Sequence, residues 1–137
     1  MEWIERRLLP SPYVCLALTE EGFHKAMEAC NVPEGQRGDF ITRGKNATTH
    51  VLQRGDGDMA CVVCVAGYEE RTPIEVAGLL VHEAVHVWQT LRDDIMSELK
   101  PGWECEAYSI QFISQRLMES FVDQTQGTTL LYRKTCV

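Results

Sequence analysis

The sequence lacks any uninterrupted apolar run that could cross a membrane, and it has few basic residues. A membrane-spanning helix needs about 18 or more consecutive apolar residues, and no run in this chain is that long. Lysine and arginine together number 13, against 20 aspartates and glutamates, so the net charge is −7. This acidic balance argues against a nucleic acid or an anionic membrane as the main partner.

The first ten residues, MEWIERRLLP, also lack the features of a signal peptide, because acids come early and the apolar part is short. We therefore expect a cytoplasmic protein whose six cysteines are reduced thiols. Cys61 and Cys64 have the spacing of a zinc knuckle, but they lie in an apolar stretch typical of a buried strand. Residues three apart in a strand point to opposite faces, so we interpret both as small core residues. A redox or zinc-knuckle role for this pair is an alternative reading.

The length and composition predict one soluble globular domain over residues 1–137. A chain of 137 residues is enough for one ordinary domain, and 45% hydrophobic with 24% charged residues is typical of that class. No internal repeat or low-complexity segment is visible.

The order of the expected elements indicates an α+β fold built on a small three-stranded sheet. Residues 31–45 contain proline, glycines and mixed charge, which predicts a loop that could cover a cleft. A Gly/Asp-rich turn at 54–58 predicts a hairpin whose first strand lies at the edge of the sheet. The patterns predict strands over 13–18, 47–53 and 59–67, and helices over about 20–31, 73–91 and 103–122.

The second expected helix has the strongest signals and lies at the centre of the predicted fold. Thr72 is a good N-cap, Pro73 suits the first helical position, and Glu75 falls in the first turn. Apolar residues cover most of the circumference of this helix, which is typical of a buried central element.

This helix carries an H-E-x-x-H motif formed by His82, Glu83 and His86. Residues four apart share one face of a helix, so the two imidazoles can bind one metal ion. The adjacent glutamate can reach a water on that metal, which is the arrangement used in metal-assisted hydrolysis of an amide.

A catalytic zinc site usually has three protein ligands, and the third must be a carboxylate here because no histidine follows His86. Glu104 and Glu106 open the next expected helix, and residues two apart on a helix diverge by about 200°, so only one can face the metal. We prefer Glu104, because Ala107 one turn later permits close helix packing. Glu106 remains open, as do more distant acids in the connecting segment, such as Asp93.

His82-Glu83-x-x-His86 followed by Glu104-x-x-Ala107 resembles the motif of the gluzincin metallopeptidases. In size and element order the chain resembles the minimal, single-domain members of that family. The segment from about 73 to 121 also resembles small phage-encoded HExxH proteins. The resemblance implies a zincin-like domain with Zn²⁺ held by the two histidines and Glu104, and Glu83 activating water. Gluzincins often have an acid four residues after the ligand glutamate, where this chain has Tyr108.

The resulting hypothesis is zinc-dependent hydrolysis of peptide bonds. The resemblance implies a peptide or protein substrate extended along edge strand 47–53. We assign Tyr108 a catalytic role, with Tyr68, Tyr132 and His50 as other candidates for stabilising the oxyanion. The alternative is a catalytically silent, zinc-bound scaffold or regulatory protein, for example one encoded by a phage. The sequence leaves the oligomeric state open.

Overall fold

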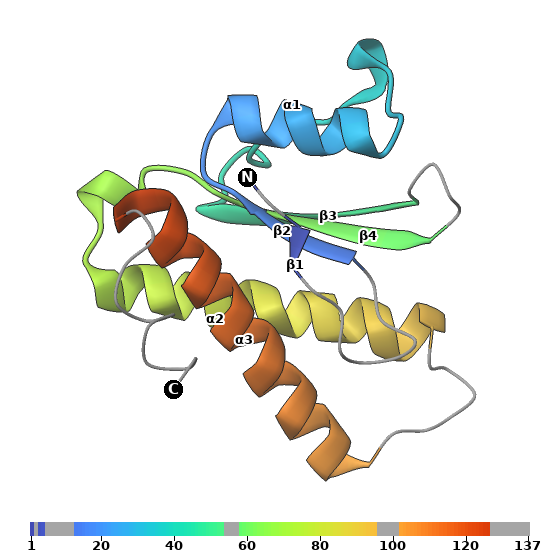
Figure 1. The fold of residues 1–137 in the computed structure, drawn as a ribbon, viewed down its shortest axis with the longest axis vertical. Coiled ribbons are helices and arrows are strands. Elements are labelled where there is room, and N and C mark those ends of the chain that lie inside the picture. The colour runs from blue at the N-terminus through green and yellow to red at the C-terminus, as the bar shows by residue number, and fades with distance from the viewer. Residues whose placement is uncertain (2, 5–12, 54–57, 96–101, 127–137) are drawn as a thin grey trace.

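The chain folds into a four-stranded mixed sheet with helices on both faces (Figure 1). This computed structural model describes all residues except 2, 5–12, 54–57, 96–101 and 127–137. In chain order the elements are β1 (Trp3–Ile4), β2 (Tyr13–Ala17), α1 (Glu20–Ala29), the 3₁₀ turn η1 (Glu34–Gln36), β3 (Ala47–Gln53), β4 (Met59–Val65), the 3₁₀ turn η2 (Tyr68–Glu70), α2 (Pro73–Thr90), the π-helical turn η3 (Leu91–Ile95) and α3 (Trp103–Gln126).

The predicted α+β class is confirmed, but the prediction of three strands was wrong by one. The strand order is β1-β2-β4-β3, with β2 parallel to β4 and both outer pairs antiparallel. The additional strand β1 has two residues, too few to show the alternation by which a strand is recognised in a sequence. β3 lies at the edge of the sheet, as expected. Most of the predicted turn at 54–58 lies outside the described residues.

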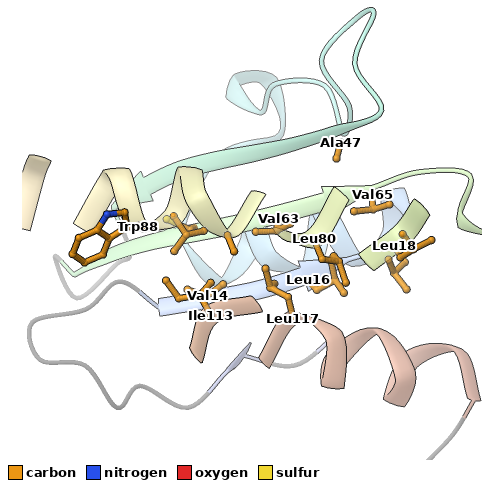
Figure 2. Packing of buried hydrophobic residues seen from close by; sticks show 14 of the residues in the cluster. Val14, Leu16, Leu18, Ala47, Val63, Val65, Leu80, Trp88, Ile113 and Leu117 are labelled. Atoms are coloured by element: carbon orange, nitrogen blue, oxygen red, sulfur yellow. The ribbon is translucent and has the colours of Figure 1, made fainter. Parts of the chain in front are cut away.

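The alternation of side chains along the strands divides the interior into two hydrophobic clusters. One cluster joins the sheet to α2 and α3, and the other joins it to α1 (Figures 1 and 2). Cys61 belongs to the first cluster and Cys64 to the second, so their side chains point to opposite faces of β4. This confirms the interpretation of the two thiols as core residues, and both are fully buried.

The signals at the start of α2 act as expected. The Thr72 side chain accepts a hydrogen bond from the backbone N–H of Glu75 at 3.2 Å, and Pro73 occupies the first turn. The helix continues into the π-helical turn, a geometry often found at functional sites. Of the other predicted helices, α1 ends two residues early and α3 continues to Gln126.

α2 and β3 run in the same direction, and this places the site. In Figure 2, Leu80 of α2 lies toward the same end of the sheet as Ala47, the first residue of β3, whereas Trp88 lies toward the opposite end. That end holds the last residues of β3, since Gln53 is paired with Met59, the first residue of β4. Within the described part of the chain, no helix is both long and apolar enough for a transmembrane span.

Candidate functional site

His82 and His86 stand side by side on the open face of α2. Their Nε2 atoms are 3.2 Å apart, and the ring centroids are separated by 4.9 Å with the planes at 74°. Both residues are exposed. The four-residue spacing in the motif therefore places the two imidazoles on one face of the helix, with their Nε2 atoms in contact.

Gln89 fixes the orientation of one of these rings. Its Oε1 atom lies 2.9 Å from Nδ1 of His86, where it can only accept a hydrogen bond. In neutral His86 the proton is then on Nδ1, so Nε2 of His86 is the acceptor in the 3.2 Å contact with Nε2 of His82. A polar partner on the far nitrogen of a histidine is the usual means of preparing that ring as a metal ligand.

Glu83 lies beside the histidine pair but is turned toward the sheet. It is 3% exposed, and its Oε2 accepts a hydrogen bond from the Thr49 hydroxyl of β3 at 2.5 Å. Its Oε1 lies 4.0 Å from Nε2 of His82. A buried carboxylate is costly unless it is hydrogen-bonded, so Thr49 both stabilises Glu83 and fixes its position beside the imidazoles.

A cleft of about 440 Å³ lies between α2 and the edge strand β3, and the motif forms one of its walls. It is lined by Thr42, Lys45, Ala47, Thr48, Thr49, Val51, His82, Glu83, His86, Gln89, Thr90 and Asp93. The predicted loop at 31–45 therefore contributes its last residues to the border of this cleft.

The first turn of α3 lies on a different flank of α2. Glu106 accepts a hydrogen bond from the buried indole N–H of Trp88 at 2.8 Å. Because Trp88 follows His82 by six residues, its side chain points about 240° further around the helix axis, away from the face that carries the histidines. Glu104 is exposed and does not line the cleft. The structure thus brings His82, Glu83 and His86 together but does not bring Glu104 to them.

Of the predicted partners for the oxyanion, Tyr108, Tyr68 and His50 also lie away from the cleft. Tyr108 is 66% exposed, and Tyr68 packs edge-on against Phe121. His50 stacks on Phe23 at the other face of the sheet. Tyr132 lies outside the described residues. Among the residues that the structure describes, no three His, Cys, Asp or Glu side chains are grouped closely enough to hold a metal ion.

Asp93 and Lys45 are two further charged residues that line the cleft. From the sequence, Asp93 is a remote alternative for the third ligand, and Lys45 has no predicted role. Asp93 bonds Arg92 at 2.8 Å, and this hydrogen bond lowers the pKa of the Asp93 carboxyl below its usual range.

Thr49 was missed by sequence reasoning. Its contact with Glu83 depends on the register of β3 against β4 and on the packing of α2. Its only sequence signal is its place on the same strand face as Ala47 and Val51.

No protein-family model matches this chain, and no curated protein or solved structure matches it either. Its function is therefore inferred from the residues of the site.

Proposed function

We propose that the chain is a zinc-dependent metallopeptidase with a zincin-like arrangement of α2 and β3. The observation that carries this proposal is the 3.2 Å separation of the Nε2 atoms of His82 and His86. Two tetrahedral nitrogen ligands, each at 2.0–2.1 Å from one zinc ion, would lie roughly 3.3 Å apart. The hydrogen bond between Nδ1 of His86 and Oε1 of Gln89 leaves Nε2 of His86 able to donate its lone pair to a metal ion. The two imidazoles have the donor type and the spacing of two of the three protein ligands that a catalytic zinc usually has.

Glu83 supplies the acid–base chemistry in this proposal. A zinc ion bound by the histidine pair would polarise the scissile carbonyl and lower the pKa of a bound water toward ~7. Glu83 takes a proton from the attacking water and later delivers it to the nitrogen of the leaving amine. The hydrogen bond from Thr49 holds Oε2 of the carboxylate, so Oε1, which lies 4.0 Å from Nε2 of His82, is the oxygen that would take the proton.

The cleft suits an extended peptide. It follows the edge strand β3, whose outer backbone groups can pair with a substrate strand by β-addition. Val51, which is 44% exposed, and Thr49 line the cleft on the β3 side.

The third protein ligand stays a prediction. Glu104 is implied by the resemblance to gluzincins, and Asp93 is the carboxylate that lines the cleft. Zinc content measured on Glu104→Ala, Asp93→Ala and Glu106→Ala will identify the ligand by the loss of bound metal. The catalytic role of Tyr108 also stays a prediction, and Tyr108→Phe tests it.

The decisive comparison for the proposed activity is wild type against Glu83→Gln, with His86→Ala as the metal-binding control. Wild type loaded with one zinc ion should cleave members of a broad peptide library. Glu83→Gln should keep the zinc and lose cleavage by a factor of about 10² or more, since general acid–base catalysis contributes about that much. His86→Ala should lose zinc as well.

Two outcomes would refute the proposal. Cleavage by Glu83→Gln at the wild-type rate would show that Glu83 is not the general acid–base group. Stoichiometric zinc in wild type with no cleavage of any library peptide would support the zinc-bound scaffold instead.

A further inference from the structure

The charged residues that line the cleft differ in how far their charge is already compensated. Glu83 is buried and bonded to Thr49, and Asp93 is paired with Arg92. Lys45 is exposed, and within the described part of the chain no carboxylate forms an ion pair with its ammonium group. Lys45 is thus a cation at the cleft that is available to a ligand.

Lys45 and Asp93 lie at opposite ends of the cleft. Lys45 precedes β3 by two residues, and Asp93 follows α2 by three. Because β3 and α2 run in the same direction, the start of the strand and the end of the helix are far apart (Figures 1 and 2). The histidine pair lies between them, since its neighbour Glu83 contacts Thr49 in the middle of β3.

This arrangement gives a bound peptide a defined polarity. Antiparallel pairing with an edge strand is slightly more stable per residue than parallel pairing. A peptide that pairs antiparallel with β3 runs from the Asp93 end to the Lys45 end. The residues that follow the scissile bond therefore lie toward Lys45.

The reach of Lys45 can be estimated from strand geometry. Thr49 follows the start of β3 by two residues, which is roughly 7 Å of strand, and Lys45 lies two residues before that start, with a bend at Asn46 between them. A substrate strand advances about 3.4 Å per residue, so with the reacting bond opposite Thr49 the start of β3 lies opposite the second residue beyond that bond, and Lys45 lies past that start. The long, flexible Lys45 side chain can lean back toward the second or third residue.

We infer that Lys45 is a specificity-determining residue that binds a carboxylate two or three residues after the scissile bond. This inference rests on the proposed peptidase function and names its substrate class. The carboxylate can be an Asp or Glu side chain or the free C-terminus of a short peptide. Lysine acts as a point charge and does not require the bidentate geometry of arginine, so both sources fit.

Matched peptides test this inference on zinc-loaded wild type, Lys45→Met and Lys45→Glu. The peptides differ by Asp or Asn at the second or third position after the cleaved bond, and by a free or amidated C-terminus at the same distance. An Asp on the other side of the bond serves as the positional control. Arg43→Glu is the matched protein control, because Arg43 is an exposed neighbouring cation that does not line the cleft.

Exposed ion pairs have modest strength, so we expect wild type to prefer the acidic peptide by about two- to fivefold in kcat/KM. Lys45→Met should abolish this preference and Lys45→Glu should invert it, whereas Arg43→Glu should keep it. A preference for the free C-terminus alone would identify the terminal carboxylate as the source, and a preference for internal Asp would identify a side chain. Equal rates for acidic and neutral peptides in wild type would overturn the inference. A preference for Asp before the scissile bond would overturn it too.

Binding separates this inference from the proposed activity. Fluorescence anisotropy of the same labelled peptides requires no cleavage, and it compares Glu83→Gln alone with the double variant Glu83→Gln, Lys45→Glu. If wild type does not cleave, but the acidic peptide binds more tightly than the neutral one and Lys45→Glu removes this difference, the peptidase proposal fails and carboxylate recognition stands. If wild type cleaves, and Lys45→Glu has the same peptide preference as wild type in both binding and cleavage, only the role of Lys45 fails.

Discussion

The hydrogen bond from Thr49 to Glu83 gives the sharpest test of how the site is built. Thr49→Val keeps the shape of the side chain but removes the hydroxyl, so the carboxylate of Glu83, which is 3% exposed, loses its donor from β3. A hydrogen bond to a charged group contributes about 1.5–3 kcal/mol, and we expect that loss in the free energy of unfolding. For a domain of this size the melting temperature should fall by roughly 5–12 °C.

A double-mutant cycle isolates this contact. Glu83→Leu removes the buried charge, and replacing both partners by apolar groups can be nearly neutral. In that background Thr49→Val should cost less than about 0.5 kcal/mol. Thr48→Val is the matched control on the same strand, because the Thr48 hydroxyl accepts only a neutral bond from the backbone N–H of Thr42 at 2.9 Å. Its cost should be near ~1 kcal/mol, as for an ordinary neutral bond.

The assay is urea unfolding of the four proteins of the cycle and the control, followed by circular dichroism. An equal cost of Thr49→Val in wild type and in the Glu83→Leu background would refute the contact. A cost in wild type no larger than that of Thr48→Val would refute the reasoning that a buried carboxylate depends on Thr49.

Two further predictions concern buried groups away from the cleft. Burial raises the pKa of the Cys15 and Cys64 thiols, so the unfolded chain loses these protons first and stability should fall as the pH rises above about 8.5. Between about pH 8.5 and 10 the loss should be about 1.5 kcal/mol per thiol, smaller in Cys64→Ala and unchanged in Cys105→Ala, and urea unfolding across this range measures it. Glu106→Leu leaves the indole N–H of Trp88 without its acceptor, which should cost about 1–3 kcal/mol. Glu106→Gln, whose amide oxygen can still accept, should recover most of that loss in thermal unfolding, and equal losses in the two variants would contradict the assigned contact.

Much of the local structure could be predicted from the sequence because it depends on neighbouring residues. The start of α2 follows from Thr72 and Pro73, and the pairing of His82 with His86 follows from the helical repeat. The opposite orientation of Cys61 and Cys64 follows in the same way from the repeat of a strand.

The parts that could not be predicted depend on how distant elements pack. The contact between Glu83 and Thr49 spans 34 residues and requires both the register of β3 and the position of α2. Which flank of α2 meets α3 is likewise decided by tertiary packing, and here Trp88, not the histidine pair, meets Glu106. Lys45 reaches the cleft only because the segment before β3 borders it.

The most direct test of the central proposal is the X-ray absorption spectrum of the zinc-loaded protein. Zinc held by His82 and His86 should show nitrogen or oxygen donors at about 2.0–2.1 Å with the multiple scattering of two imidazoles, and His86→Ala, which loses the zinc, should lose this signal. A shell of sulfur donors at about 2.3 Å, or an imidazole signal unchanged in His86→Ala, would contradict the proposal.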